Sequence, residues 1–183
     1  MISCHIASLP ERESSLRQTI NSIYKQVSKI YVSLNGYPQE PNWLTEMYNT
    51  KCITLDNSLG DAAKFLNCWD EPAICLVLDD DLIVPKDYVQ YMINGLAKYG
   101  GAVSLHGKKY STRPIEHYRR NFTANFRCLN TVLEDSKVDI IGTGIMAFDN
   151  TQVKFDKSLL EHKNMADVLF AKLTVKTDNL SQA

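Results

Sequence analysis

An apolar run that ends in three consecutive aspartates constrains this chain more than any other feature. Residues 74–78 read Ile-Cys-Leu-Val-Leu, and Asp79, Asp80 and Asp81 follow directly. A continuous apolar run of this length is typical of a strand buried on both faces, as in the centre of a parallel sheet. Adjacent carboxylates repel one another unless a cation, hydrogen bonds or raised pKa values relieve the repulsion. We therefore expect a central strand with a charged site at its carboxyl end.

The rest of the chain predicts strands that alternate with helices. Further strands are expected at residues 2–7, 29–34, 52–55, 102–105, 138–141 and 145–148. Helices are expected after a cap at Ser14 or Ser15, around residues 43–48, from Asp61, from Pro85 and over residues 165–173. This alternation is typical of an α/β fold with a mixed, mostly parallel central sheet flanked by helices. Residues 106–130 lack the pattern and predict a long, basic loop of the kind that forms a lid.

Length and composition predict one ordinary globular domain and disfavour two classes of partner. The chain has 183 residues and a net charge of −1, which gives no general attraction to nucleic acid. Its longest apolar run, residues 73–78, is too short to span a membrane, so we expect no transmembrane segment. The N-terminus lacks a signal-peptide pattern, which predicts a cytoplasmic protein. Five cysteines without a Cys-x-x-Cys pair predict reduced thiols.

The aspartates themselves indicate a metal site. Asp79 and Asp81 are two residues apart, so an extended backbone would direct both side chains to one side and Asp80 elsewhere. Two carboxylates on one side can hold Mn²⁺ or Mg²⁺ together with a diphosphate. Alternatively, the aspartates cap the helix near Pro85 or lie in a solvated turn.

Several segments together resemble a known family. They are residues 2–12 (Ile-Ser-Cys-His-Ile-Ala-Ser-Leu-Pro-Glu-Arg), residues 60–65 (Gly-Asp-Ala-Ala-Lys-Phe), the aspartate triplet, His106-Gly107, residues 141–144 (Ile-Gly-Thr-Gly) and residues 163–171 (Lys-Asn-Met-Ala-Asp-Val-Leu-Phe-Ala). In this order they resemble blocks of the inverting, family-2-like glycosyltransferases of the GT-A fold, which carry an Asp-x-Asp motif. Chlorovirus-encoded and bacterial polysaccharide-building domains are the members that the chain resembles most. The resemblance spans most of the chain.

This resemblance implies a nucleotide-sugar donor, with UDP as the nucleotide, bound by about residues 1–105. The residues that it assigns to donor binding are Ala7, Ser8, Leu9, Arg12, Asn35, Asp61, Lys64, Asp79 and Asp80. It also implies that Asp81 is the main protein ligand of Mn²⁺ or Mg²⁺, with Asp79 as a second ligand or a ribose contact. Many members have two acidic residues where this chain has Leu34-Asn35-Gly36, so base recognition would depend on the Asn35 amide or on the backbone.

The second half, about residues 106–183, is expected to bind a glycan or another hydroxyl acceptor. The family's Glu-Asp pair is replaced here by Asn164-Met165, which leaves Asp167 as the only acid of that block. The resemblance therefore implies that Asp167 is the general base of a transfer with inversion. Without the resemblance, Asp167 is interpreted as an ordinary acidic residue near a helix N-terminus. The chain is also compatible with being one module of a longer protein.

Two other functions stay open. A nucleotide-sugar-binding module with little turnover would keep the fold, and the missing Glu-Asp pair favours it. A Mg²⁺-dependent phosphatase of the haloacid dehalogenase type also has Asp-x-Asp after a strand. That motif normally lies near the N-terminus, however, and Ile83 stands where it has Thr or Val. Metal-dependent hydrolysis of a nucleotide-sugar separates an enzyme from a binding module.

Overall fold

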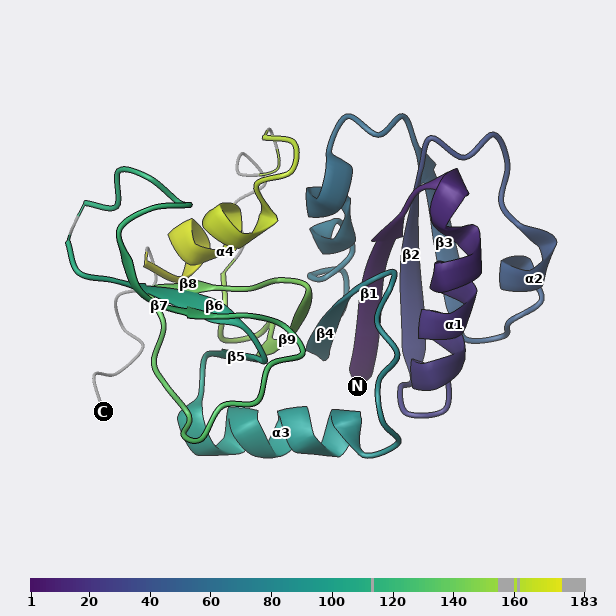
Figure 1. Ribbon diagram of the computed structural model, residues 1–183. Helices are drawn as coiled ribbons and strands as arrows, with labels where there is room; N and C mark the ends of the chain where they lie inside the picture. Colours follow the sequence, from purple (N-terminus) through teal and green to yellow (C-terminus); the bar gives the residue numbers. More distant parts are fainter. Residues whose placement is uncertain (113, 155–159, 161, 176–183) are drawn as a thin grey trace.

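The computed structural model describes residues 1–112, 114–154, 160 and 162–175, which form two β-sheets with helices around them (Figure 1). The described strands of the larger sheet follow the order β3-β2-β1-β4-β9-β5. Their bounds are Ile2–Ser8 for β1, Lys29–Asn35 for β2, Thr50–Leu55 for β3, Ile74–Asp79 for β4, Ala102–Ser104 for β5 and Ile145–Asp149 for β9. The strands β3, β2, β1 and β4 are parallel, whereas β9 is antiparallel to both β4 and β5. The predicted mixed, mostly parallel sheet is confirmed.

A smaller antiparallel sheet lies beside the larger one. It consists of β7 (Phe122–Phe126), β6 (Gly107–Tyr110) and β8 (Ile140–Ile141) in the order β7-β6-β8. The prediction of a loop without regular structure over residues 106–130 is therefore wrong. The sequence of β6, Gly-Lys-Lys-Tyr, carries little of the β-branched and aromatic enrichment that marks a strand. Its partners lie further along the chain, so a local pattern does not reveal the pairing.

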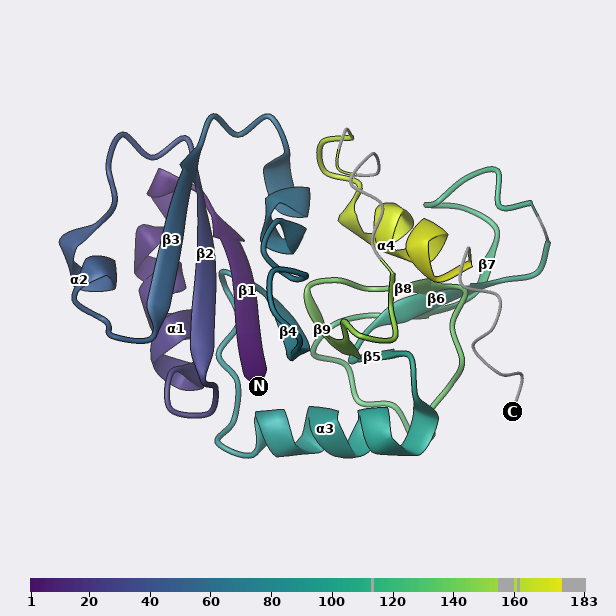
Figure 2. The same ribbon diagram turned by 180° about the vertical axis from the view of Figure 1, so that it is seen from behind.

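Helices cover both faces of the larger sheet. The helices α1 (Glu13–Ile23) and α3 (Tyr88–Tyr99) pack on one face, and the 3-10 helix η2 (Gly60–Phe65) and α4 (Ala166–Val175) pack on the other. Figure 1 shows α1 in front of the sheet, and Figure 2 shows it behind the sheet. The short helix α2 (Asn42–Thr45) lies at the edge next to β3. The helix η2 stands where the sequence predicts an α-helix from Asp61.

Strand β4 occupies the centre of this layered arrangement. It pairs with β1 on one side and with β9 on the other. Leu76 and Leu78 pack into the apolar cluster under α1 and α3, whereas Cys75 and Val77 pack into the cluster under η2 and α4. Both faces of the strand are therefore buried, which confirms the structure predicted from its continuous apolar run.

Two helices begin at other residues than the sequence predicts. α1 begins at Glu13, directly after the 3-10 helix η1 (Pro10–Arg12), and Ser15 donates its hydroxyl proton to the Arg12 carbonyl oxygen at 2.9 Å instead of capping. α3 begins at Tyr88, because a turn comes first in which the Tyr88 N–H donates to the Pro85 carbonyl oxygen at 3.1 Å. Both differences are shifts of a helix end and leave the layers unchanged.

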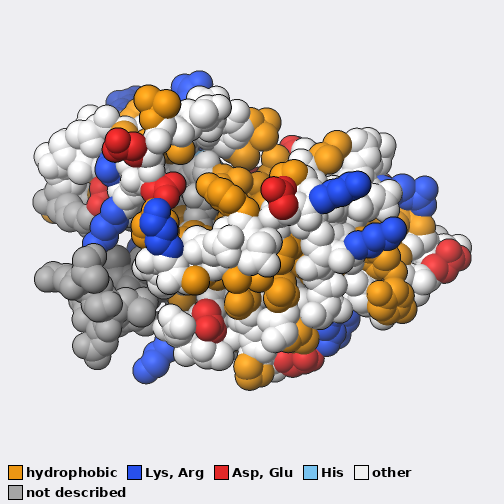
Figure 3. All heavy atoms as spheres, turned by 90° about the horizontal axis from the view of Figure 1, so that it is seen from below, with side chains coloured by type: hydrophobic (Ala, Val, Ile, Leu, Met, Phe, Trp, Pro, Cys, Tyr) orange, Lys and Arg blue, Asp and Glu red, His pale blue; other side chains and the backbone are white. Residues whose placement is uncertain are grey.

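The surface on the α3 side carries exposed apolar side chains. Seen from the α3 side, apolar side chains gather near the middle of this face, with acidic and basic side chains scattered around them (Figure 3). Tyr91 and Tyr99 of α3 are exposed. Within the described ranges, no helix combines the length and the apolar character needed to cross a bilayer.

Candidate active site

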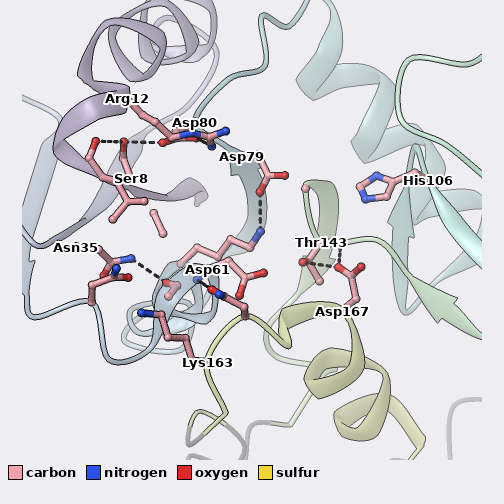
Figure 4. A pocket seen from close by; sticks show the side chains of 17 residues that line it. Ser8, Arg12, Asn35, Asp61, Asp79, Asp80, His106, Thr143, Lys163 and Asp167 are labelled. Atoms are coloured by element: carbon pink, nitrogen blue, oxygen red, sulfur yellow. Dashed lines mark hydrogen bonds and ion pairs between the residues drawn. The ribbon is translucent and has the colours of Figure 1, made fainter. Parts of the chain in front are cut away.

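A cleft of about 470 Å³ lies at the carboxyl ends of β1, β2 and β4 (Figure 4). In open α/β sheets, this edge is where ligands bind. We call one side of the cleft the first wall; it carries Ser8, Arg12, Lys64, Asp79 and Asp80. The opposite side, the second wall, carries His106, Thr143 and Asp167, with Tyr118 behind them. The second wall comes from segments far along the chain from the first.

Asp80 and Asp81 share one arginine of the first wall. Asp80 is buried, and its carboxylate accepts hydrogen bonds from the Ser8 hydroxyl at 2.6 Å and from Arg12 Nη1 at 2.5 Å. The second terminal nitrogen of Arg12 lies 3.1 Å from Asp81 Oδ2. Burial raises the pKa of Asp80, although Ser8 and Arg12 act in the opposite direction. Because β4 ends at Asp79, the extended backbone that was expected to continue to Asp81 is absent, and that geometric prediction is wrong.

Asp79 pairs with a different cation. The Nζ atom of Lys64 donates to Asp79 Oδ1 at 2.8 Å; the Lys64 side chain is 3% exposed and that of Asp79 is 47% exposed. The Asp79 N–H also donates to the Gly144 carbonyl oxygen at 2.8 Å, so the turn at Gly144 is joined to the end of β4. A Cβ atom at Gly144 would lie 2.5 Å from Asp79 Oδ2. Glycine is thus required here to leave the carboxylate its place.

Asn35, at the end of β2, presents a free acceptor to the cleft. Its Nδ2 atom donates to the Gly60 carbonyl oxygen at 2.8 Å, and its buried Oδ1 atom has no partner in the described part of the chain. Gly60 has a φ of +56°, and a Cβ atom there would lie 2.1 Å from Asn164 Oδ1. Next to it, burial raises the pKa of Asp61. Figure 4 shows Asn35 on the side of the cleft away from His106, with Asp61 between Asn35 and Asp167.

Asp167 is held on the second wall by neutral donors. Its Oδ1 atom accepts from the Thr143 backbone N–H at 2.8 Å and from the Thr143 hydroxyl at 2.7 Å, and its Oδ2 atom accepts from the Tyr118 hydroxyl. Burial alone would raise the pKa of Asp167, but these donors outweigh it and the pKa lies below its usual value. Burial, and then the nearby Asp167, raise the pKa of Tyr118. The Asp167 carboxylate is therefore ionised and engaged on both oxygens.

His106 stands where the cleft meets a second, smaller hollow. This side hollow of about 270 Å³ is lined by His106 and Asp167 together with Lys108, Tyr118, Phe126, Arg127 and Ile140, among others. Burial lowers the pKa of His106, more than the charges of Asp167 and Asp79 raise it. The two hollows thus meet at one neutral imidazole and one carboxylate.

The structure brings the predicted site residues together, with one exception. Those that line the cleft are Ala7, Ser8, Leu9, Arg12, Asn35, Asp61, Lys64, Asp79, Asp80 and Asp167. Asp81 lies outside the lining and has a side chain that is 49% exposed. Lining residues that the sequence analysis did not assign to the site are Asn57, Gly60, His106, Thr143, Gly144, Lys163 and Asn164. Asn57 and Gly60 both have positive φ, so the Asn-x-x-Gly turn after β3 was an available signal for them.

The carboxylates of Asp79 and Asp81 suit Mg²⁺ or Mn²⁺ in their chemistry. Such hard ions prefer oxygen ligands and are commonly held by one or two carboxylates together with substrate phosphates. Asp79 and Asp81 are both about half exposed, so both can reach an ion in solution. Among the described residues, one group of three possible ligand atoms lies within 4.8 Å of one another: those of His5, Cys68 and Cys75. This group is buried and sulfur-rich, and it does not include the aspartates. The aspartates would therefore bind such an ion together with a ligand rather than alone.

Comparison with known proteins establishes the fold and not the family. No family model matches the chain, and no curated protein matches it. Among solved structures, S. aureus TarS 1–349 is similar with a TM-score of 0.59 and 15% identity, over 94% of this chain and 54% of that one. The 4-diphosphocytidyl-2C-methyl-D-erythritol synthase of Anaerococcus prevotii is similar with a TM-score of 0.52 and 14% identity, over 96% and 82%.

These two proteins are a glycosyltransferase and a nucleotidyltransferase, and both have a GT-A-like fold. The chain spans about half the length of the TarS structure. The similarity confirms the predicted fold class, a mixed α/β fold of GT-A type. At such low identity it says nothing about the chemistry of this cleft, which depends on the residues described above.

Proposed function

We propose that this chain is a glycosyltransferase that moves a sugar from a UDP-sugar to a glycan or another hydroxyl acceptor with the help of Mn²⁺ or Mg²⁺. The observation that carries the proposal is the pair of Lys64 and Asp79 in the cleft, a buried cation beside a half-exposed carboxylate at the end of the central strand. An ammonium group at this place attracts the diphosphate of a nucleotide-sugar. The carboxylate attracts the divalent cation that accompanies it.

The nucleotide is proposed from the resemblance of the sequence, which selects UDP. Asn35 lines the cleft, and its Oδ1 atom is a buried acceptor without a partner among the described residues. A base could pair with such an acceptor through a ring N–H group, as in uracil and guanine, or through an amino group, as in cytosine and adenine. This contact therefore does not choose among the bases.

Asp79 and Asp81 are the residues proposed to hold the cation, and Asp80 holds Arg12 in place beside them. When bound, the cation neutralises the charge that develops on the departing diphosphate. Arg12 and Lys64 add fixed positive charge on the first wall, where the diphosphate would lie. This arrangement stabilises the leaving group and leaves the acceptor to the second wall.

The acceptor is proposed to enter through the side hollow. Its aromatic side chains, Tyr118 and Phe126, offer faces on which a sugar ring can stack. A hydroxyl that reaches the cleft from there meets His106 and Asp167, either of which can take its proton. A direct displacement with inversion then needs no nucleophile from the protein.

The test is calorimetric binding of UDP, GDP and CDP with and without Mn²⁺. We expect UDP to bind only with Mn²⁺, and to bind at least tenfold more weakly to Asp79→Ala, because the cation loses its ligand and Lys64 its partner. Asp70 lies before β4, at the opposite edge of the sheet, so Asp70→Ala is the matched control and should bind UDP like the wild type. Asp81→Ala tests the second proposed ligand. Binding of none of the nucleotides under any condition would sink the proposal, and binding without release of UDP from UDP-sugars would favour the binding module.

A further inference from the structure

His106 lies at the junction of the two hollows, between β5 and β6. It lines both the cleft and the side hollow, as does Asp167. Figure 4 shows its ring facing the space between Asp79 and Asp167. An acceptor hydroxyl that passes from the side hollow into the cleft meets this ring and the Asp167 carboxylate.

Two glycines leave room for the His106 ring. A Cβ atom at Gly142 would lie 1.9 Å from His106 Cδ2 and 2.0 Å from Nε2, and one at Gly144 would lie 3.1 Å from Cε1. Neither glycine has a positive φ, so the backbone conformation does not require them. The backbone of His106 is fixed as well, since its carbonyl accepts from the Gly142 N–H at 2.9 Å. The ring position is thus the physical reason for glycine at Gly142, whereas at Gly144 the ring adds to the limit set by the Asp79 carboxylate.

One nitrogen of the His106 ring can act as a proton acceptor. Nδ1 is enclosed by the protein and has no hydrogen-bond partner among the described residues, so an acceptor hydroxyl would have to reach Nε2. Burial lowers the pKa of His106, so the imidazole is neutral at pH 7 and one ring nitrogen carries a lone pair. The charged groups that face it are Asp79, Asp167, Lys64 and Lys108, and they oppose one another in sign.

Asp167 is less suited to that task. Both of its oxygens already accept hydrogen bonds, from Thr143 and Tyr118, and its pKa is lowered. A carboxylate with a lowered pKa is a weaker base, because general-base efficiency falls as the pKa moves away from the working pH. Its hydrogen bonds instead join α4 to the turn at Thr143 and to the segment before β7. Asp167 therefore serves better to hold the second wall in shape.

We propose that His106 is the general base of the reaction and that Asp167 is a positioning residue for the second wall. This inference rests on the proposed glycosyl transfer. The acceptor O–H bond breaks and its proton moves to a ring nitrogen of His106, while the acceptor oxygen forms a bond to the anomeric carbon. The bond from that carbon to the diphosphate oxygen breaks, and its electron pair leaves with the nucleoside diphosphate. The imidazolium then releases the proton to water.

The experiment compares UDP binding with UDP release from UDP-glucose and UDP-N-acetylglucosamine, with water as the acceptor. We expect His106→Gln to bind UDP within about threefold of the wild type and to lose at least about 10²-fold in kcat, with little change in KM. The matched control is His117→Gln, because His117 is exposed and lies outside both hollows. Asp167→Asn should keep more turnover than His106→Gln.

A second pair of variants tests the ring position without removing the imidazole. Gly142→Ala pushes the ring away, so we expect it to lose turnover while it still binds UDP. Gly95→Ala, whose new Cβ would lie 3.5 Å from Val103, is its control and should keep full turnover. Turnover of His106→Gln within threefold of the wild type would overturn the inference, as would a larger loss in Asp167→Asn than in His106→Gln.

Three outcomes show what fails: both proposals or the inference alone. A wild type that binds UDP-sugars but releases no UDP into water would overturn the role of His106, because a base at this place would activate water, and it would also count against the proposed transfer. A wild type that binds no nucleotide would overturn the proposed function itself, and this inference with it. UDP binding with an active His106→Gln would remove only the inference.

Discussion

Each wall of the cleft holds a carboxylate beside the ligand space, buried in Asp80 and half-buried in Asp167, but the two walls hold it by different means. Asp80 on the first wall is held by an arginine and one hydroxyl, and burial keeps its pKa raised. Asp167 on the second wall is held by neutral donors on both oxygens, and its pKa is lowered. Arg12 is largely open to water, which screens its charge, whereas the donors of Asp167 point directly at it. Asp80 is also more deeply buried and faces the charge of Asp81, so its pKa stays raised despite Ser8 and Arg12.

The difference also separates what the walls can offer a ligand. The first wall contains the ion pairs of Arg12 and Lys64, whose cations can be shared with an incoming anion. The second wall keeps its carboxylate satisfied and leaves the neutral imidazole of His106 free. The first wall is thus suited to binding a charged ligand, and the second wall offers a group that can accept a proton.

Removal of the Asp167 carboxylate should have the largest effect on stability. Asp167→Ala leaves the Thr143 N–H, the Thr143 hydroxyl and the Tyr118 hydroxyl without their acceptor, which should lower the free energy of unfolding by about 3 kcal/mol. Urea denaturation measures it. Thr143→Val removes only one of these donors and should cost about 1 kcal/mol. A loss below 1 kcal/mol for Asp167→Ala would show that the donors find other partners and that the walls do not differ as described.

The Lys64–Asp79 pair should respond unequally to loss of either partner. Asp79→Ala leaves a buried ammonium unpaired; since Asp79 is 47% exposed and water can enter, we expect a loss of about 2 kcal/mol. Lys64→Met leaves a solvated carboxylate and should cost less than about 1 kcal/mol. The double variant is the control and should regain part of the stability lost in Asp79→Ala. Equal losses in both single variants would contradict the burial of Lys64.

The pH dependence of stability should have opposite signs on the two walls. The pKa of Asp167 is lowered in the folded state, so its contribution is present above about pH 3.8, the usual value, and is lost as the pH falls further. The pKa of Asp80 is raised, so its contribution is present below that pH and is lost as the pH rises through the folded value. Thermal unfolding of Asp167→Asn and Asp80→Asn from pH 7 to pH 3 checks this. On acidification, the difference in Tm by which Asp167→Asn falls below the wild type should shrink. The Tm of the wild type should rise relative to that of Asp80→Asn. If both differences change in the same direction, the contrast between the walls is refuted.

Arg12 should have the smallest effect on stability. Its side chain is 46% exposed, so Arg12→Ala should lower the free energy of unfolding by no more than about 1 kcal/mol, and less at high salt. Chemical denaturation at low and at high NaCl concentration measures both. A larger or salt-independent loss would mean that the arginine is held as firmly as the donors of Asp167, which would remove the difference between the walls.

Much of the first wall follows from the sequence alone. The buried strand β4 and its acidic end were predicted from the apolar run, because strand periodicity is local, whereas the residues at the ends of β1 and β2 were assigned by the resemblance. The partners within the wall were less predictable. Asp80 and Asp81 share Arg12 because the chain turns after Asp79, and a turn of this kind changes side-chain directions without a strong sequence signal.

The second wall followed from the sequence only in part. Asp167 was singled out by a resemblance, whereas its partners Thr143 and Tyr118 and the neighbouring His106 were not assigned to the site. Thr143 lies 24 positions before Asp167 along the chain, Tyr118 lies 49 positions before it, and His106 lies further away still. The smaller sheet that carries them has short strands, one of them polar, and its pairing depends on contacts between distant segments.

The sequence by itself determined the α/β layers, the buried central strand and the acidic end of that strand, because hydrophobic periodicity and turn residues act over a few neighbouring positions. Only the tertiary structure decided which cation each aspartate meets, that both oxygens of Asp167 are engaged, and that His106 stands between two hollows with a free nitrogen. These properties depend on distances between segments that the chain brings together only when it folds. Burial and hydrogen bonding then set the protonation of each group, and neither exists before the core has formed.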